Sequence, residues 1–414
     1  MKTDVVVVGG GPAGMAAAYE AQKNGAKVVI IEREYRLGGI LNQCIHNGFG
    51  LHFLGEELTG PEYANHWIKK IEEAKIKTML SSAVIDVKKK GDKDVLLTIE
   101  NEEGIKKIHA KAVIFANGCR EKPGPAINLC GDRPAGIYSA GEAQKIVNIH
   151  GKMVGRKVVI LGSGDIGLIM ARRMTCEGAK VLGVYEIMPT CGGLARNVTQ
   201  CLDDFNIPLY LSHSIVKVCG EQRVNGVIVA PVKPDFSFDL KKQKFVECDT
   251  VLLSVGLLPE TELLSGNNLE ESKVTNSYVV NEFYQTTQKE FFVCGNVLHV
   301  NDLVDNVTRE GMKAGECAAK FVTKGLPQRN KIQVLFDKNI RYVSKSYVYK
   351  NKDKTSIFFR VSKEMKKVFI NAYSDDEKIA TLFKPVVRPG TIEELVIDKQ
   401  KLKSNLVLKV EESL

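Results

Sequence analysis

Short apolar runs and longer stretches with helical spacing alternate along most of this chain. An apolar strand is predicted at 4–8, followed by a glycine-rich turn, an alanine-rich helix to about Asn24, and a second strand at 27–31. The same order returns at 157–186, with the helix expected to end near Glu177. Short apolar runs predict buried strands, and longer periodic stretches predict helices. The pattern therefore predicts an α/β fold with two Rossmann-like domains.

The first glycine turn has the spacing of a dinucleotide fingerprint. In Gly9-x-Gly11-x-x-Gly14 the first glycine permits a tight turn, the second lets backbone approach a pyrophosphate, and the third lets the helix press against the sheet. The start of the helix adds free N–H groups and partial positive charge for phosphates. Glu32, eighteen residues after Gly14, is placed to accept hydrogen bonds from a ribose.

The second turn repeats this arrangement as Gly162-x-Gly164-x-x-Gly167, with Glu186 closing the following strand. A carboxylate at that position suits a free 2′-hydroxyl and repels a 2′-phosphate, so NAD is favoured over NADP. One such turn alone is also compatible with an ordinary glycine turn. Two of them in full strand–turn–helix context predict that the chain holds two dinucleotides.

Two later segments extend this picture. Ala116-Asn117-Gly118 and Gly295-Asn296 each end an apolar strand with small or hydrogen-bonding residues. With them, positions from about Lys2 to Lys324 resemble the two-dinucleotide flavoprotein superfamily that includes the pyridine nucleotide-disulfide oxidoreductases. The resemblance implies that the first turn binds FAD and the second NAD(H). Asn117 and Asn296 stand where the superfamily has Thr and Asp, and Asn296 keeps a side-chain acceptor for the ribityl chain.

The resemblance also supplies the sets of residues expected to contact each cofactor. The FAD set is Gly9, Gly11, Pro12, Ala13, Gly14, Glu32, Arg33, Gly39, Ala116, Gly118, Gly295 and Asn296. The NAD set is Gly162, Gly164, Asp165, Ile166, Gly167 and Glu186.

The expected domain plan places one dinucleotide domain inside the other. Residues 1–123 and 255–326 would form the FAD domain, 124–254 the inserted NAD(H) domain, and 328–414 a small C-terminal β-sandwich-like domain. Short strands are predicted in that last part at 333–336, 356–361, 368–373 and 406–410. It carries 19 Lys and Arg against 11 Asp and Glu, and so +8 of the chain's +9 charge. A solvated surface is the simplest interpretation, docking to an acidic partner is the second, and no nucleic-acid motif accompanies the charge.

A narrower resemblance rests on four segments, Leu37–Gly50, Leu58–Tyr63, Gly162–Arg172 and Cys191–Asn197. These segments are similar to a bacterial family of FAD and NAD oxidoreductases. Genes of that family commonly lie beside genes for anaerobic glycerol-3-phosphate dehydrogenase-like flavoproteins. The resemblance implies a partner dehydrogenase subunit, although no residue here independently marks a pocket for a phosphorylated polyol.

Candidate redox chemistry beyond the cofactors centres on Cys44. Disulfide reductases of the superfamily use Cys-x4-Cys or Cys-x-x-Cys, and neither spacing occurs among the ten cysteines. Cys44 can be a single redox thiol, a residue against the flavin, or a small buried residue, which is the usual fate of an intracellular cysteine. His46 can protonate a thiolate or the reduced flavin, or it can serve packing. No metal site is expected.

Helical spacing at 308–320 predicts a helix with Thr308 as a possible cap. By the resemblance, its positive end would point at the flavin and favour the anionic reduced form, while the spacing alone is equally compatible with an ordinary packing helix. With 44% apolar and 26% charged residues, no apolar run of bilayer length and no room for a signal peptide, a cytoplasmic protein is expected.

Three hypotheses follow. The preferred one is a flavoenzyme subunit that moves electrons between NAD(H) and FAD and exchanges them with a partner dehydrogenase. The second is a stand-alone NADH-dependent reductase of a small disulfide, peroxide or dioxygen, which uses Cys44. The third is a non-catalytic flavoprotein, a scaffold or a redox sensor.

Overall fold

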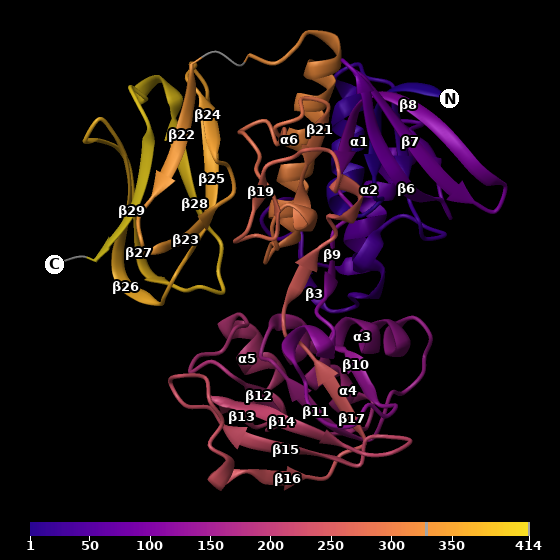
Figure 1. Cartoon of the computed structure of the whole chain (residues 1–414), viewed down its shortest axis with the longest axis vertical. Coiled ribbons are helices and arrows are strands. Elements are labelled where there is room, and N and C mark those ends of the chain that lie inside the picture. Colours follow the sequence, from indigo (N-terminus) through magenta and orange to yellow (C-terminus); the bar gives the residue numbers. More distant parts are fainter. Residues whose placement is uncertain (328–329, 413–414) are drawn as a thin grey trace. The chain divides into compact units, whose positions relative to one another are not determined.

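The chain folds into two compact units in a computed structural model that describes residues 1–327 and 330–412. Unit 1 consists of Met1–Cys119 and Pro259–Leu414, and unit 2 of Arg120–Leu258 (Figure 1). Unit 2 is thus an insertion in unit 1. The boundaries expected from the sequence, 123/124 and 254/255, lie four residues from the two crossings. The short strands β9 (Cys119–Glu121) and β18 (Leu257–Pro259) pair at these crossings.

The main sheet of unit 1 has the strand order β5-β2-β1-β8-β7-β6, and β21 pairs with the last residues of β8. Strand β1 pairs parallel with β2 and β8, whereas β6, β7 and the start of β8 form an antiparallel meander. Residues Val5–Val8 of β1 are buried because this strand is central and covered on both faces. The strands are β1 (Lys2–Val8), β2 (Val28–Ile31), β5 (Lys77–Met79), β6 (Ala83–Gly91), β7 (Asp94–Asn101), β8 (Gly104–Phe115) and β21 (Phe291–Val293).

Helices α1 (Pro12–Lys23) and α6 (Val304–Thr323) pack closely against each other, and α2 (Gly60–Glu73) lies beside α1 (Figure 1). A Cβ at Gly311 would lie 2.2 Å from the carbonyl oxygen of Ala13, and one at Gly315 would lie 2.1 Å from that of Ala17. Glycine at both positions therefore lets the two helix backbones approach. This contact holds α6 against the first turn of α1. The minor strands of this unit are β3 (Asn47–Phe49), β4 (Leu58–Thr59), β19 (Glu271–Ser272) and β20 (Ser277–Tyr278).

The start of α6 differs from the prediction. The helix begins at Val304, four residues before Thr308, and Leu303 occupies the N-cap without a side-chain hydrogen bond. Thr308 lies inside the helix, where its hydroxyl bonds the hydroxyl of buried Tyr63 at 2.7 Å. The predicted Thr308 cap is therefore wrong, because a tertiary hydrogen bond, rather than capping, explains this threonine.

Unit 2 is built on a parallel sheet in the order β10-β17-β11-β12-β13, with a separate antiparallel sheet β14-β15-β16. Its second strand–turn–helix–strand motif is formed by β11, α4 and β12, as the sequence predicts. The elements are β10 (Ile137–Ser139), α3 (Ala140–Asn148), β11 (Lys157–Leu161), α4 (Asp165–Cys176), β12 (Lys180–Glu186), α5 (Ala195–Cys201), β13 (Leu209–Leu211), β14 (His213–Cys219), β15 (Gly226–Pro231), β16 (Lys244–Val246) and β17 (Thr250–Leu253).

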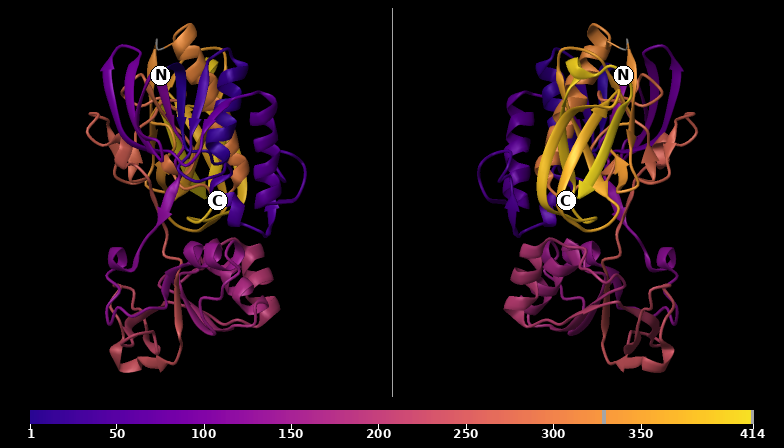
Figure 2. Two further views of the ribbon diagram at one scale, coloured as in Figure 1. Left: turned by 90° about the vertical axis from the view of Figure 1, so that its right-hand side faces the viewer. Right: turned by 90° about the vertical axis from the view of Figure 1, so that its left-hand side faces the viewer.

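The C-terminal part of unit 1 is a two-sheet β domain, as expected. One sheet has the order β24-β22-β29-β26-β27 and the other β23-β25-β28, and apolar residues of both share one core (Figure 2, yellow and orange). All four predicted strands are present as parts of β22, β25, β26 and β29. The strands are β22 (Lys331–Phe336), β23 (Ile340–Val343), β24 (Tyr347–Tyr349), β25 (Lys354–Val361), β26 (Met365–Ser374), β27 (Glu377–Val387), β28 (Glu393–Asp398) and β29 (Leu406–Glu412). Among the helices of the described ranges, none is long and apolar enough to cross a membrane.

Candidate functional site

The first glycine turn is tight on one side and open on the other. Gly9 has a φ of +102°, and a Cβ there would lie 2.6 Å from the carbonyl oxygen of Ala116 at the end of β8. A Cβ at Gly14 would lie 1.9 Å from the Gly9 oxygen, whereas one at Gly11 would meet no atom of the described residues within 4 Å. The turn thus leaves open space where a ligand's pyrophosphate would approach the start of α1.

Glu32 braces this turn from the end of β2. Its buried carboxylate accepts the Gly10 N–H at 2.6 Å on Oε2 and the Glu34 N–H at 2.8 Å on Oε1. Each carboxylate oxygen has a second lone pair and can accept a further bond, for example from a ribose hydroxyl. Arg33, the next residue of the predicted FAD set, is exposed.

Two glycines from distant segments converge on the same turn. A Cβ at Gly39 would lie 3.1 Å from the Gly11 Cα, and one at Gly295 would lie 2.8 Å from the Ala13 Cβ. Both glycines have positive φ, 55° and 72°. Asn296 follows, and its Oδ1 accepts the Asn301 N–H at 3.0 Å. The structure therefore gathers most of the predicted FAD set around the N-terminus of α1.

The segment after β8 contributes a buried polar atom. Asn117 donates from Nδ2 to the Glu260 carbonyl at 2.7 Å, while its buried Oδ1 has no hydrogen-bond partner in the described residues. Gly118 follows with a φ of +75° and open space at its Cβ position. A buried acceptor beside open space fits a site that receives a polar ligand.

The second turn, in unit 2, has the same geometry. Gly162 has a φ of +95°, and its Cβ would lie 2.2 Å from the Ser254 carbonyl oxygen. Buried Glu186 accepts the Ser163 N–H at 2.9 Å and hydroxyl at 2.7 Å on Oε2, and the Met188 N–H at 2.9 Å on Oε1. Glu186 therefore braces its turn as Glu32 braces the first one.

Asp165 plays a part that the sequence did not indicate. Its Oδ1 accepts the Leu194 N–H at 2.8 Å and the Asn197 Nδ2 at 2.6 Å, and Ser163 Oγ accepts the Gly192 N–H at 2.8 Å. These hydrogen bonds hold the segment from Gly192 to α5 against the second turn. The bonded residues lie almost thirty positions apart in the sequence, so only the structure reveals the contact.

Cys44 and His46 lie after a short 3-10 helix, Gly39–Gln43. Cys44 is buried, its Sγ donates to the Ile40 carbonyl at 3.3 Å, and burial raises the pKa of the thiol to about 12. His46 Nδ1 lies 2.9 Å from the Asn47 carbonyl oxygen, and its ring centroid lies 5.0 Å from that of Phe49. A thiol with so high a pKa is almost entirely protonated near neutral pH and is a weak nucleophile.

The first turn of α6 carries a buried acid. Asp305 Oδ1 accepts the Phe53 N–H at 2.7 Å, and Asp305 is almost fully buried. A carboxylate there offsets the partial positive charge of the helix N-terminus. The dipole contribution expected at this end of α6 is therefore opposed by a negative side chain.

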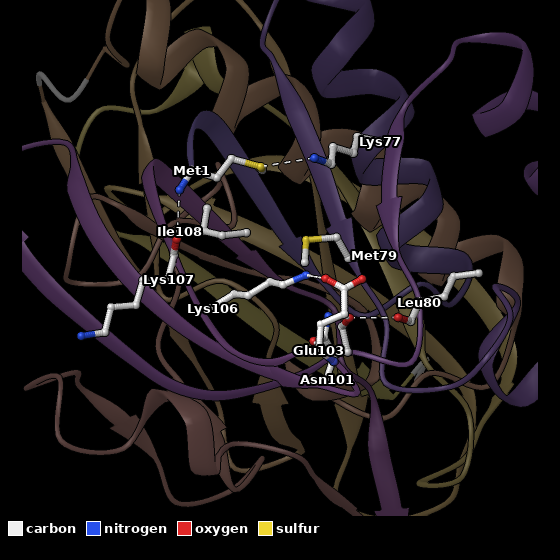
Figure 3. Close-up of a pocket in the computed structure, with 10 residues that line it drawn as sticks. Met1, Lys77, Met79, Leu80, Asn101, Glu103, Lys106, Lys107 and Ile108 are labelled. Carbon is white, nitrogen blue, oxygen red and sulfur yellow. Dashed lines mark hydrogen bonds and ion pairs between the residues drawn. The ribbon is translucent and has the colours of Figure 1, made fainter.

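A hollow elsewhere in unit 1 is separate from these turns. It has a volume of about 510 Å³ and is lined by residues of β5, β7 and β8 and their flanks (Figure 3). Lys106 pairs with Glu103 at its rim, and Lys77 Nζ lies 3.5 Å from Met1 Sδ. None of the predicted site residues lines it. Within the described ranges, no group of three or more His, Cys, Asp or Glu is placed to hold a metal ion.

The family model for the pyridine nucleotide-disulphide oxidoreductases matches residues 3–320, from β1 to the last turn of α6. The chain belongs to this family. Enzymes of the pyridine nucleotide-disulphide oxidoreductase family use FAD and NAD(P)H, so this chain is a flavoprotein oxidoreductase by membership. The resemblance to the superfamily is confirmed. The match ends before the β domain.

Curated relatives of this oxidoreductase include components of larger enzymes. Hydrogen cyanide synthase subunit HcnB of Pseudomonas protegens is 28% identical over 319 residues, which cover 72% of this chain and 66% of that protein. One of the subunits of opine oxidase from Agrobacterium tumefaciens is 26% identical over 71% of this chain and 61% of its own length. The mitochondrial dihydrolipoyl dehydrogenase of Caenorhabditis elegans is 28% identical over 75% and 66%. The chain spans about two thirds of the length of these relatives.

Solved structures show the same fold. Thioredoxin reductase of T. acidophilum is 23% identical, with a TM-score of 0.63 over 77% of this chain and 98% of that one. Thioredoxin reductase of Lactococcus lactis is 19% identical, with a TM-score of 0.65 over 78% and 99%. The Rossmann-like α/β architecture of this family member is therefore established.

Both glycine turns fit the cofactors of the family. Open space at Gly11, the convergence of Gly39 and Gly295, and the buried acceptor of Asn117 suit a large dinucleotide at the first turn. At the second turn, a Cβ at Gly164 would lie within 4 Å of two atoms in the part of the chain that the structure describes, the Ser254 hydroxyl at 3.2 Å and the Ser254 carbonyl oxygen at 3.7 Å. The backbone of each helix start is thus accessible to phosphates.

Proposed function

We propose that this protein is a flavoenzyme subunit that transfers electrons between NAD(H) and FAD and exchanges them with a partner protein. One observation carries the proposal: two glycine turns, in two separate units, are braced in the same way by Glu32 and Glu186. Residues 1–119 and 259–326 would form the FAD domain, and unit 2 the NAD(H) domain.

FAD would lie at the first turn, on Gly9, Gly11 and the start of α1. Gly39, Gly118 and the Gly295–Asn296 turn would surround it, with Glu32 toward the ribose of its ADP half. NAD(H) would lie at the second turn, on Gly162, Gly164 and the start of α4. The bound flavin and nicotinamide supply the redox chemistry, and the chain's own residues bind them, orient them and exclude water.

NADH is the proposed nicotinamide substrate because of Glu186. Its Oε2 already holds Ser163 and its Oε1 holds Met188, which fixes a negative charge at the end of β12. That charge suits a ribose with free hydroxyls and disfavours a 2′-phosphate by repulsion and desolvation. The proposed preference for NADH thus depends on a carboxylate that cannot change its rotamer without losing three hydrogen bonds.

A partner protein is supported by two kinds of relative. The hydrogen cyanide synthase and opine oxidase relatives are, by name, subunits. The narrower resemblance of Leu37–Gly50 and Cys191–Asn197 favours a glycerol-3-phosphate dehydrogenase-like flavoprotein as the partner. We propose that class, with the basic β domain as a candidate docking surface.

The stand-alone alternative depends on Cys44 as a redox thiol. Burial and the high pKa of this thiol disfavour attack on a disulfide or peroxide. The Cys44→Ser substitution separates the two functions, because it would abolish a thiol mechanism but leave reduction of the flavin by NADH intact. A non-catalytic flavoprotein, the third hypothesis, would bind FAD that NADH does not reduce.

The deciding experiment is anaerobic stopped-flow mixing of the FAD-loaded protein with NADH and, separately, with NADPH. Rapid bleaching of the flavin absorbance by NADH and much slower bleaching by NADPH is the expected result. Bound flavin that neither nucleotide reduces would overturn the proposal for the chain alone. Equal rates with both nucleotides would overturn the assigned role of Glu186.

A further inference from the structure

A line of hydrogen-bonded polar groups joins the β domain to the Gly295 turn. Glu310 of α6 accepts the Gly295 N–H at 2.8 Å on Oε2, and its Oε1 lies 2.8 Å from His299 Nε2. His299 Nδ1 lies 3.4 Å from the Tyr342 hydroxyl, which in turn lies 3.2 Å from Arg360 Nε. His299 and Glu310 are at most 2% exposed, so water does not compete for the bonds that Glu310 accepts.

The chemistry of the groups sets the direction of each hydrogen bond. A carboxylate only accepts, so His299 donates from Nε2 to Glu310 and, when neutral, must accept at Nδ1. Tyr342 then donates its hydroxyl proton to His299 and accepts from Arg360, whose guanidinium only donates. All bonds therefore run one way, from Arg360 to Glu310, and each donor polarises the next.

Arg360, in β25, binds the loop that leads from the Gly295 turn into α6. Its guanidinium pairs with Asp302 and donates to the carbonyl oxygens of Val300 at 3.0 Å and Pro389 at 3.2 Å. Asp302 also accepts the Ile392 N–H at 2.7 Å. Residues 300–302 are thus held by β25 and by the segment after β27, both in the β domain.

Another buried ion pair joins the β domain to the rest of unit 1, and it does not contact the Gly295 turn. Glu282 pairs with Lys399 and accepts the Tyr349 N–H at 2.8 Å. Both charged side chains are about as buried as the His299–Glu310 pair. The two sets can therefore be compared by mutation, since only one contacts the turn beside α1.

We propose that Tyr342 and Arg360 of the β domain are positioning residues for the flavin, acting through His299 and Glu310 on the Gly295–Asn296 turn. Gly295 lies against Ala13 at the start of α1, so a shift of the turn alters the space beside the helix N-terminus. The inference rests on the proposal that FAD occupies this turn. It gives the β domain, which lies outside the matched family region, a role in the cofactor site.

Glu310 adds an electrostatic effect to the positional one. Its carboxylate is fully buried behind the turn, where charge is poorly screened. A fixed negative charge near the flavin opposes the gain of negative charge on reduction. The wild-type flavin potential is therefore lower than it would be with a neutral group at this position.

The test compares Tyr342→Phe and Glu310→Gln with two controls in the FAD-loaded full-length protein. Tyr63→Phe also removes a phenolic hydroxyl from a buried hydrogen bond, in this case to Thr308 of α6. Lys399→Met breaks the ion pair that does not reach the turn. The readouts are the rate of FAD release, followed by fluorescence after dilution, and the flavin midpoint potential. Thermal unfolding of each apoprotein reports the purely structural cost.

We expect Tyr342→Phe to speed FAD release roughly three- to tenfold, the effect of one buried hydrogen bond, and Glu310→Gln to raise the midpoint potential. The controls should leave both quantities near wild type even where they lower the unfolding temperature. Unchanged release and potential in Tyr342→Phe and Glu310→Gln would overturn the inference, as would equal changes in the controls. Failure of the wild-type protein to bind FAD would instead refute the proposed function.

Discussion

Glu186 accepts two hydrogen bonds from Ser163, one from the backbone N–H at 2.9 Å and one from the hydroxyl at 2.7 Å. This double contact ties the carboxylate to the glycine turn that precedes α4. The corresponding turn in unit 1 has only a backbone bond, because residue 10 is glycine. The second site thus has an additional polar contact, and its consequences can be measured.

Replacing Glu186 with Gln should weaken the discrimination between NADH and NADPH. The negative charge that repels a 2′-phosphate is lost, while one amide oxygen can still accept from Ser163. A hydrogen bond to a charged group contributes about 1.5–3 kcal/mol, so kcat/KM for NADH should fall roughly tenfold or more while that for NADPH falls less or rises. Flavin reduction rates over a range of both nucleotides measure this. Ser163→Ala, which keeps the charge, is the control, and an unaltered NADH to NADPH ratio in Glu186→Gln would contradict the prediction.

Alanine at Gly11 should weaken FAD binding, whereas alanine at Gly14 should lower stability. Gly11 has φ −75° and ψ −174°, which alanine adopts readily, and its added Cβ would have no atom within 4 Å among residues 1–327 and 330–412. Gly11→Ala should therefore unfold at the wild-type temperature but bind FAD roughly tenfold more weakly, because the methyl group occupies ligand space. Gly14→Ala should lose about 1–3 kcal/mol or more of stability, since its Cβ would lie 1.9 Å from the Gly9 oxygen.

Thermal unfolding of the apoproteins, together with FAD titration, separates these two outcomes. Retention of full FAD affinity by a folded Gly11→Ala protein would show that the cofactor does not approach this backbone.

Cys44 should react with alkylating reagents far more slowly than the exposed thiols of Cys130 and Cys176. Burial raises its pKa to about 12, so only a minute fraction is thiolate at pH 8, and the side chain is also inaccessible. Mass spectrometry after timed alkylation gives the order of labelling, with the unfolded protein as reference. Equal labelling of Cys44 and Cys130 in the native protein would restore the case for a reactive thiol.

Lys345 should make the stability of unit 1 depend on pH above neutrality. Burial lowers its pKa from 10.5 to about 8, although the nearby carboxylates of Glu310 and Glu282 act to raise it. Between those values the unfolded chain binds a proton that the native chain lacks, so this residue makes stability rise with pH there. Its Nζ also donates to the Ser356 carbonyl at 2.8 Å.

Lys345→Met should therefore unfold at a higher temperature than wild type at pH 7. This difference in unfolding temperature should shrink as the pH rises from about 8 toward 10.5, because the wild-type protein then no longer has to bury a charged Lys345. Unfolding temperatures of both proteins across this range measure the difference. A difference that does not vary with pH would mean that Lys345 does not titrate there.

The elements with the simplest local signals were predictable from sequence. Strands β1 and β11 are almost wholly apolar, and the glycine spacing that follows each of them determines the turn. Strand β27 was missed because most of its residues, among them Lys378, Thr381 and Phe383, are exposed to some degree, so that no regular apolar pattern marks it. The start of α6 was misplaced because Leu303 gives no capping signal.

The parts of the site that depend on tertiary contacts were not predictable. Glu310 resembles any helical glutamate until Gly295 and His299 are seen to share its carboxylate. The sequence predicts Asp165 within the glycine turn, whereas in the structure it is the first residue of α4. Its bonds to Leu194 and Asn197 depend on how a distant loop folds back. Patterns along a chain reveal spacing, and they do not reveal which buried groups will meet.

The contact of α1 with Gly311 and Gly315 also sets an order in which the protein can be completed during synthesis. Unit 2 is one continuous segment and has all its residues once Leu258 has been made. The first glycine turn, although made earliest, lacks its packing partner until α6 has emerged. The inserted unit can therefore fold before its host is complete, whereas α1 lacks this packing partner until a helix about three hundred residues later in the chain has been synthesised.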